Sequence, residues 1–294
     1  GLECDGDEGN DTLRQKWEFK NNTEALCSFQ TDRFFELIDG KKRVLAGLES
    51  TYPDQGDLEE EGLEPKYDHL QVLYTWVYQR ANFWDASTET LTTPKTYNGV
   101  RYTTERDYRK AIFINEFDKH FNRNHALVYY LFNEFVALCD NRAKNMFLRC
   151  EDVRCEQLLN TSGEEMSIYD AINMETGEVD ASMIDWENST FAVWIADLYD
   201  LDSCFGVENS GYLQIPYYAD WNYHLNGTQK FNGRESRLWL MFEEALADDI
   251  EKKAQELTDK SAGGGLNYEA LYDYHIRNKL VLFQNRQPVH FYYL

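Results

Sequence analysis

Two short apolar runs that lie beside clusters of oxygen-bearing side chains constrain this chain most. The run Met146 to Leu148 follows a loop that carries Asp140 and, five positions later, Asn145. The run Thr190 to Tyr199 leads into Asp200-Leu201-Asp202. Carboxylate and amide oxygens at the ends of buried strands suit a divalent cation and phosphate. The pattern predicts a helix, a polar loop, a strand, an insertion over Cys150 to Glu187 and a second strand.

The clearest local signal is Asn98-Gly99, which stands between two runs rich in threonine and tyrosine. Both residues tolerate the positive φ angles of a type I′ turn, so a two-residue β-hairpin is predicted within Thr92 to Thr103. Thr104, with Asp107 three residues later, is typical of a helix N-cap. We expect that helix to continue to about Phe121.

Apolar residues at helical spacing predict further helices. The segment Tyr67 to Tyr78 has this spacing, and Ala126 to Cys139 is apolar on most faces. The second segment is therefore expected to be the central buried helix, beginning after a break at residues 122–124. The remaining predicted elements are a strand or helix start over Lys16 to Phe19, a strand over Arg33 to Ile38, an acidic loop over Asp57 to Glu64, a strand over Tyr212 to Tyr218, a long helix over Gly233 to Leu257 and a last helix over Asn267 to Leu280.

Composition excludes several classes of function. The formal net charge is -23, so we expect the chain to repel nucleic acid and anionic lipid. The sequence contains no apolar run of about 18 residues, so no membrane span is predicted. The six cysteines and six histidines show no zinc-ligand spacing; Cys150 and Cys155 have no second pair to complete a site.

The central stretch resembles part of a known enzyme family. Asp140-x4-Asn145, on a loop after a predicted buried helix, has the spacing of the protein-kinase catalytic loop. Asp200 follows an apolar strand, as the metal-binding Asp of kinases does. With Phe205-Gly206 after it, Asp200-Leu201-Asp202 resembles the spore-coat CotH family of atypical kinases. The resemblance covers roughly the middle third of the chain.

This resemblance implies a fold and a site. The fold would be α+β and helix-rich, an atypical protein-kinase-like (CotH-like) large lobe with a partial small lobe. Asp140 would be the catalytic base, Asn145 and Asp200 would hold metal, and Asp202 would assist the metal or the fold. The cofactors would be Mg²⁺ or Mn²⁺ with ATP. We expect the side chains of Asp140, Asn145 and Asp200 to converge on one cavity, because the two predicted strands would be neighbours.

The same resemblance implies a division of the chain. Residues 1–12 would be a flexible acidic lead-in, residues 13–103 a partial small lobe with the hairpin, and residues 104–294 the kinase-like helical lobe with an insertion at 150–189. No glycine-rich nucleotide loop precedes the central stretch. Lys16 and Lys20, on either side of Glu18, are the positions considered for the phosphate-binding lysine.

A second resemblance covers more of the chain. It takes in Lys16 to Thr23, Asn98 to Thr104, Asp140 to Phe147, Tyr199 to Ser203 and Asn209 to Gly211. Together these segments resemble large virion proteins of gut-bacterial tailed phages, crAss-like ones among them, which are tail or neck components. The resemblance implies a place in the virion, with other virion proteins or further copies of the chain as partners, and it brings no chemical mechanism.

Two functions therefore remain open. The first is a structural domain of a tailed-phage virion protein (tail or neck) on a CotH-kinase-like scaffold, which the missing glycine-rich loop favours. The alternative is an active CotH-like kinase of the bacterial cytoplasm or spore coat, which the four oxygen-bearing residues favour. The Asp-x4-Asn pair can also simply cap a helix and hold a turn. Asp200 and Asp202 can equally bind a structural cation, or pair with Arg142 and Lys144.

Overall fold

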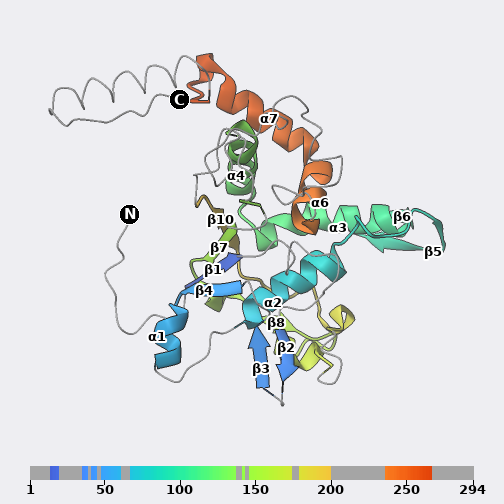
Figure 1. Ribbon diagram of the computed structural model, residues 1–294. Helices are drawn as coiled ribbons and strands as arrows, with labels where there is room; N and C mark the ends of the chain where they lie inside the picture. Colours follow the sequence, from blue (N-terminus) through green and yellow to red (C-terminus); the bar gives the residue numbers. More distant parts are fainter. Residues whose placement is uncertain are drawn as a thin grey trace. The chain divides into compact units, whose positions relative to one another are not determined.

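The protein is a mixed α+β chain with small antiparallel sheets (Figure 1). It divides into two compact units, residues 1–246 and residues 247–294, each described by itself. None of the described helices is long and apolar enough to cross a membrane. The computed structural model describes residues 14–19, 35–38, 41–44, 48–60, 67–136, 141–142, 146–173, 179–199 and 236–266.

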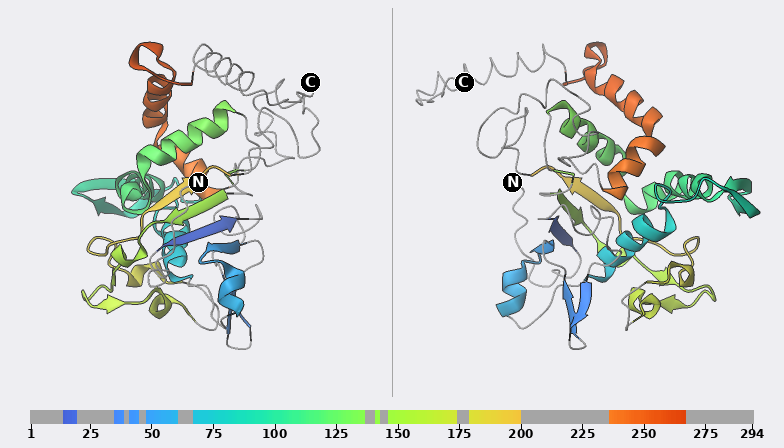
Figure 2. Two further views of the ribbon diagram at one scale, coloured as in Figure 1. Left: turned by 90° about the vertical axis from the view of Figure 1, so that its left-hand side faces the viewer. Right: turned by 45° about the vertical axis from the view of Figure 1, so that its right-hand side comes forward.

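A four-stranded antiparallel sheet organises the larger unit. Its spatial order is β10-β7-β1-β4, and Figure 2 shows strands of this sheet lying side by side. A strand from near the N-terminus therefore lies between partners that come from distant parts of the sequence. The bounds are Gln15–Phe19 for β1, Leu48–Tyr52 for β4, Met146–Cys150 for β7 and Trp194–Asp197 for β10.

One face of this sheet belongs to an aromatic core, and the other face carries charged side chains together with the ring of Phe147. Trp17 of β1 is 1% exposed and lies opposite the fully buried Leu148 of β7. The neighbouring pair, Lys16 opposite Arg149, is only partly buried. Because successive side chains of a strand point to opposite faces, the two pairs lie on different faces of the sheet. Burial of a large apolar side chain contributes roughly 1.5–3 kcal/mol, so the aromatic face decides the orientation of β1.

Helices complete the aromatic core. The fully buried ring of Trp76 stacks on Phe113 and on His120, with ring centroids 5.3 Å and 4.3 Å apart. Phe117 joins this stack to Phe242 at 5.4 Å. The predicted helix over Tyr67 to Tyr78 is confirmed. The helices concerned are α2 (Asp68–Thr75) with a π-helical extension (Trp76–Arg80), α3 (Glu105–His120) and α6 (Arg237–Ala245).

The predicted hairpin is confirmed. Strands β5 (Thr90–Tyr97) and β6 (Val100–Thr104) pair antiparallel. Asn98 has a φ of 49° and Gly99 a φ of 77°, as a type I′ turn requires. The Thr104 hydroxyl accepts a hydrogen bond of 3.1 Å from the backbone N–H of Asp107 and so caps α3, as the sequence predicted.

Helix α4 (Arg123–Phe135) differs from its prediction in start and in buried face. The predicted break at residues 122–124 is too long, because the Asn122 side chain caps the helix and Arg123 is already helical. Phe135, expected in the core, is 43% exposed. Tyr129 and Tyr130 are buried instead, against the ring of Trp239 at 5.5 Å and 6.3 Å. A helix that is apolar all round carries no sequence signal for the face that meets its neighbours.

Two other expectations are corrected. Residues Gln55–Glu60 form helix α1, which overlaps the start of the acidic loop predicted over Asp57 to Glu64. The predicted long helix over Gly233 to Leu257 is interrupted at Leu246, after which α7 (Ala247–Thr258) begins the second unit. The predictions for Tyr212 to Tyr218 and Asn267 to Leu280 lie outside the described residues.

The remaining described elements are short. The strand expected over Arg33 to Ile38 is confirmed as β2, and the segment between β7 and β10 is rich in turns as predicted. The bounds are β2 (Phe35–Ile38) and β3 (Lys41–Val44), β8 (Leu158–Leu159) and β9 (Glu165–Met166), and 3-10 turns at Val153–Cys155, Ile168–Ala171, Ala181–Met183 and Lys260–Ala262.

Candidate functional site

The four residues that the sequence singled out for chemistry, Asp140, Asn145, Asp200 and Asp202, lie outside the described residues. Lys20 and Lys144 also lie outside them. What the structure describes is the residues next to these positions. Within the described residues, no group of three or more His, Cys, Asp or Glu side chains could hold a metal ion.

The two strands that border the predicted site are neighbours, as the sequence analysis expected. Strand β7 pairs with β10 antiparallel, with Cys150 opposite Trp194 and Phe147 opposite Asp197. The first residues of β7 therefore lie at the same end of the sheet as the last residues of β10. The chain that comes from Asn141 and Arg142 enters β7 at this end, and the chain that leads on to Tyr199 leaves β10 at the same end.

Asn141 joins these two segments directly. Its side chain is fully buried, and its Nδ2 donates a hydrogen bond to the carbonyl of Tyr199. The Tyr129 hydroxyl of α4 donates to the carbonyl of Asn141, which holds the loop against the helix. The amide oxygen of Asn141 is buried without a hydrogen-bond partner among the described residues. A buried acceptor of this kind is suited to a water molecule or a cation.

Arg142 takes part in a separate ion pair. It is 3% exposed, its guanidinium pairs with Glu134 of α4, and its Cζ lies 4.5 Å from the ring centroid of Tyr130. Burial of Tyr130 raises the pKa of its hydroxyl to about 12, so the ring is neutral at physiological pH. Arg142 therefore anchors the loop to α4, whereas pairing of Arg142 with Asp200 or Asp202 stays a prediction.

The ammonium group of Lys16 lies over one aromatic ring of β7. Its Nζ is 4.7 Å from the ring centroid of Phe147, and that ring is 4.2 Å from the ring of Tyr199. Among the described residues, the ammonium group of Lys16 makes no ion pair with a carboxylate. Of the two lysines considered for phosphate binding, Lys16 is the one among the described residues. Its ammonium group contacts the ring of Phe147, which in turn contacts the ring of Tyr199.

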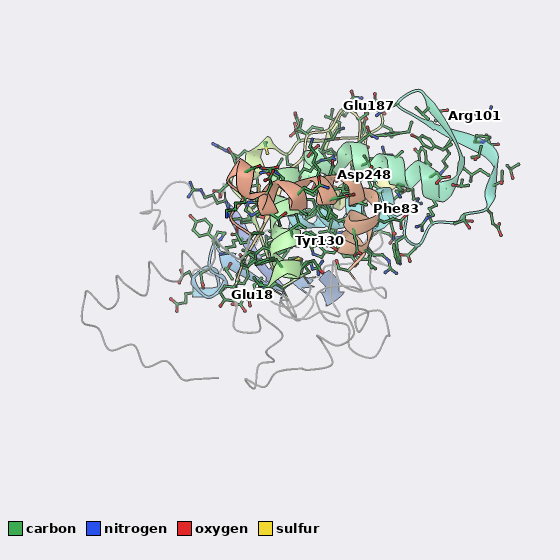
Figure 3. The ribbon with its side chains drawn as sticks, turned by 90° about the horizontal axis from the view of Figure 1, so that it is seen from above. Glu18, Phe83, Arg101, Tyr130, Glu187 and Asp248 are labelled. Atoms are coloured by element: carbon green, nitrogen blue, oxygen red, sulfur yellow. The ribbon has the colours of Figure 1, made fainter. Side chains whose placement is uncertain are left out.

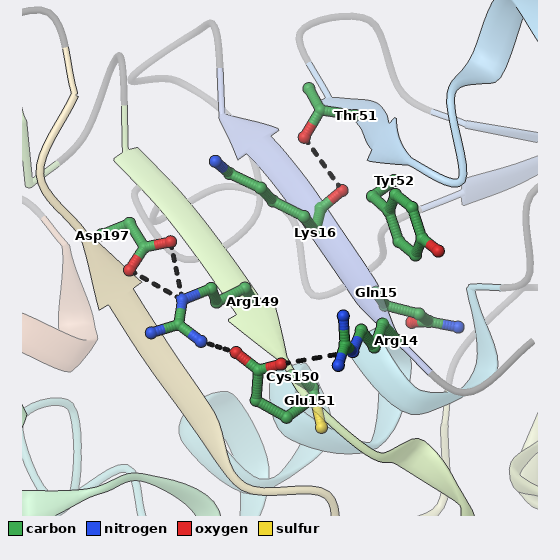
Figure 4. Close-up of a pocket in the computed structure, with 9 residues that line it drawn as sticks. All are labelled: Arg14, Gln15, Lys16, Thr51, Tyr52, Arg149, Cys150, Glu151 and Asp197. Atoms are coloured by element: carbon green, nitrogen blue, oxygen red, sulfur yellow. Dashed lines mark hydrogen bonds and ion pairs between the residues drawn. The ribbon is translucent and has the colours of Figure 1, made fainter. Parts of the chain in front are cut away.

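A cavity of about 870 Å³ opens on the charged face of the sheet (Figure 4). Arg149 lies at its centre, where its Nε donates to Asp197 at 2.9 Å and its guanidinium pairs with Glu151. Arg14 continues the chain of charges, with its Nε 3.5 Å from the same carboxylate of Glu151. The lining residues are Arg14, Gln15, Lys16, Thr51, Tyr52, Arg149, Cys150, Glu151 and Asp197.

The cavity combines three cationic groups with two carboxylates. The guanidinium of Arg149 is largely neutralised by Asp197 and Glu151, and Arg14 also pairs with Glu151, so Lys16 is the one of these three cations without an ion pair among the described residues. Such a surface suits a polar ligand that carries a negative group. Sequence reasoning missed this cavity because its residues come from four strands. The only available signal was a cation at the outward position of β1 and again at that of β7.

Cys150 lines the cavity, and Cys155 follows it five positions later in the chain. Cys150 is buried and free, and burial raises the pKa of its thiol to about 11. Cys155 is exposed and free, and desolvation also raises its pKa. Thiols with raised pKa values carry little thiolate at neutral pH and are poor nucleophiles.

Comparison of the chain with family models, with curated proteins and with solved structures found no match. The sequence and the geometry are therefore the grounds on which a function is proposed.

Proposed function

We propose that this chain is a structural domain of a tailed-phage virion protein (tail or neck), built on a CotH-kinase-like scaffold. The scaffold rests on one observation, the antiparallel pairing of β7 with β10 together with the hydrogen bond from Asn141 to Tyr199. A strand after the Asp-x4-Asn loop and a strand before the metal-binding Asp are what a kinase-like site requires. The place in the virion rests on the sequence resemblance.

Chain connectivity supports a shared site for the two predicted carboxylates. Asp140 precedes Asn141 and Asp200 follows Tyr199, and consecutive Cα atoms are about 3.8 Å apart. Because Asn141 and Tyr199 are joined by a hydrogen bond, we infer that Asp140 and Asp200 face a common space. The buried amide oxygen of Asn141 fits an oxygen-coordinated cation there, and Mg²⁺ or Mn²⁺ would screen the carboxylates and hold phosphate oxygens.

The second candidate is an active kinase, and the position of Lys16 favours it. The ammonium group of Lys16 has no carboxylate partner among the described residues. It lies over Phe147, near the end of β7 at which the catalytic residues are proposed. In this function Asp140 would orient the acceptor hydroxyl, Asn145, Asp200 and Asp202 would hold the metal, and Lys16 would contact phosphate.

Nucleotide binding separates the two candidates. Isothermal titration of the chain with ATP and Mg²⁺, repeated with Mn²⁺, is expected to show no heat of binding if the scaffold is purely structural. Metal-dependent binding together with phosphate transfer that Asp140→Ala abolishes would establish the kinase instead. Glu187→Gln, which removes one exposed carboxylate, is the control and should change neither result.

Two further observations test the scaffold and the virion assignment. A crystal structure in which the carboxylates of Asp140 and Asp200 lie on opposite faces of the sheet would refute both candidates. The genes beside the coding sequence are expected to encode portal, neck or tail proteins, and a neighbourhood of spore-coat or metabolic genes would contradict the virion assignment.

A further inference from the structure

Two cysteines that follow one another closely in the chain lie against the same stretch of backbone. Cys150 is the last residue of β7 and pairs with the first residue of β10. Cys155 lies in the turn-rich segment that leads from β7 back to β10, whose exposed residues include Glu187 (Figure 3). The hydroxyl of Thr190 in this segment donates a hydrogen bond of 2.6 Å to the carbonyl of Cys155. The chain that enters β10 therefore contacts both cysteines.

The two sulfur atoms have two neighbours in common. The Sγ of Cys155 donates to the carbonyl of Asp152 at 2.9 Å and lies 3.5 Å from the carbonyl oxygen of Phe191. The Sγ of Cys150 faces the backbone N–H of the same Asp152. The backbone N–H of Val193 lies beside both sulfur atoms. Because each sulfur atom lies against Asp152 and against Val193, the two sulfur atoms lie close together.

The chain between the two cysteines is folded back on itself. Residues Val153–Cys155 form a 3-10 turn, and the Asp152 side chain caps it by accepting a hydrogen bond of 3.0 Å from the backbone N–H of Arg154. An extended chain would separate residues five positions apart by about 17 Å, whereas a 3-10 turn rises only about 2 Å per residue. A disulfide requires Cα atoms within roughly 4.4–6.8 Å. The folded connection suits that requirement.

The two thiols differ in access to solvent. Cys155 is exposed, whereas Cys150 is 3% exposed. Burial raises the pKa of Cys150 to about 11, and the neighbouring Cys155 adds to this rise. A thiol with a high pKa forms little attacking thiolate and is also a poor leaving group in thiol–disulfide exchange. A bond between these cysteines is therefore expected to form slowly and to be reduced slowly.

We propose that Cys150 and Cys155 form an intramolecular disulfide when the chain meets a low-molecular-weight disulfide such as oxidised glutathione. The thiolate of Cys155 attacks one sulfur of the small disulfide, forms a mixed disulfide and releases one glutathione thiolate. Cys150 then loses its proton and attacks the Sγ of Cys155, which releases the second glutathione thiolate. The two cysteines lose two electrons and two protons, and the small disulfide is reduced to two thiols.

This bond fixes the turn that carries one carboxylate of the cavity. Glu151 follows Cys150 directly and pairs with Arg149 and with Arg14 (Figure 4). The proposal uses neither a place in the virion nor nucleotide binding. A chain that forms the disulfide without binding ATP leaves the function proposed above intact, and a chain that binds ATP without forming the disulfide overturns the disulfide alone.

Mass spectrometry of the full chain after incubation with oxidised glutathione in mildly alkaline buffer tests the proposal. Trypsin cleaves after Arg149 and after Arg154, so it separates the two cysteines and a disulfide between them appears as two linked peptides. We expect this linked pair, with no glutathione retained on either cysteine, and its loss after dithiothreitol. The same result is expected in a variant whose other cysteines are replaced by serine. These are Cys4, Cys27, Cys139 and Cys204.

Single variants separate the two steps. Cys150→Ser should retain one glutathione on Cys155, because no second thiol is present to release it. Cys155→Ser should leave Cys150 unmodified, because the buried thiol does not meet the oxidant. A wild-type chain that keeps glutathione on Cys155, or that shows both cysteines as free thiols, overturns the proposal. So does a Cys150 that is linked to any cysteine other than Cys155.

Discussion

Single residues in the core of this protein join elements that are distant in sequence. The carboxylate of Glu116 is 2% exposed and accepts hydrogen bonds from Trp76 Nε1 at 3.1 Å and from Arg80 at 2.8 Å. The Tyr97 hydroxyl donates to it at 3.3 Å, and the pKa of Tyr97 is raised to about 12 by burial and by this carboxylate. A buried carboxylate with three donors is fully satisfied, so Glu116 fixes the hairpin to the aromatic core.

His120 is the residue whose burial has the clearest consequence for pH. Its ring is 1% exposed and stacks between Trp76 and Phe191, with centroids 4.3 Å and 4.4 Å away. Its Nε2 has no hydrogen-bond partner among the described residues. Burial, with smaller contributions from Lys119 and Arg80, holds the pKa of His120 well below its usual value of 6.5.

The free energy of unfolding should therefore fall as pH decreases below about 6.5. The unfolded chain binds a proton at His120 in that range and the folded chain does not, which favours unfolding by up to about 1.4 kcal/mol per pH unit. Urea unfolding of wild type and of His120→Phe from pH 7 to pH 5 measures this. Burial also raises the pKa of Glu156, which changes the free energy of unfolding in the opposite direction, but it does so in both proteins. The difference between the two proteins therefore isolates the effect of His120. Equal pH dependence in both proteins would refute the assignment.

At the scale of elements, the hairpin turn is the most local feature of the fold. Gly99 has a φ of 77°, and an added Cβ would meet no atom within 4 Å. A larger residue is thus opposed by backbone conformation and not by crowding. β-branched residues resist positive φ most strongly.

Gly99→Val is accordingly expected to destabilise the β5–β6 hairpin by about 1–2 kcal/mol. Hydrogen exchange of the β5 and β6 amides, measured with urea unfolding of the whole chain, gives the local and the global effect. Gly265→Val is the control, because Gly265 has equal space around it and its φ lies outside the left-handed range that disfavours a β-branched residue. Unchanged exchange in Gly99→Val would show that the turn does not hold the hairpin.

For the whole molecule, charge determines which partners can approach. A net charge of -23 should exclude appreciable binding of duplex DNA at physiological salt. A mobility-shift titration at several salt concentrations is expected to show no complex. Salt-sensitive binding would contradict this and would point to the cations of the cavity, Arg14, Lys16 and Arg149, as a local basic patch.

The sequence alone predicted the features that depend on neighbouring residues. Asn98-Gly99 requires a type I′ turn, Thr104 caps the helix that follows it, and the spacing of Leu70, Leu73 and Trp76 produces a buried helical face. Each depends on backbone dihedral preference or on periodicity within a few residues. The pairing of β7 with β10 was also expected, but only through a family resemblance.

The tertiary structure decided the features that depend on contacts between distant segments. No local pattern indicates that β1 lies between β7 and β4, that Phe135 is exposed while Tyr129 is buried, or that a helix ends at Leu246. The candidate site likewise combines features that local spacing indicates with features that only long-range contacts produce. Its Asp and Asn residues could be proposed from spacing, whereas the bond from Asn141 to Tyr199 and the cluster around Arg149 arise only when strands far apart in sequence pair. Strand pairing and the choice of a buried face are settled by long-range packing, which local propensity does not encode.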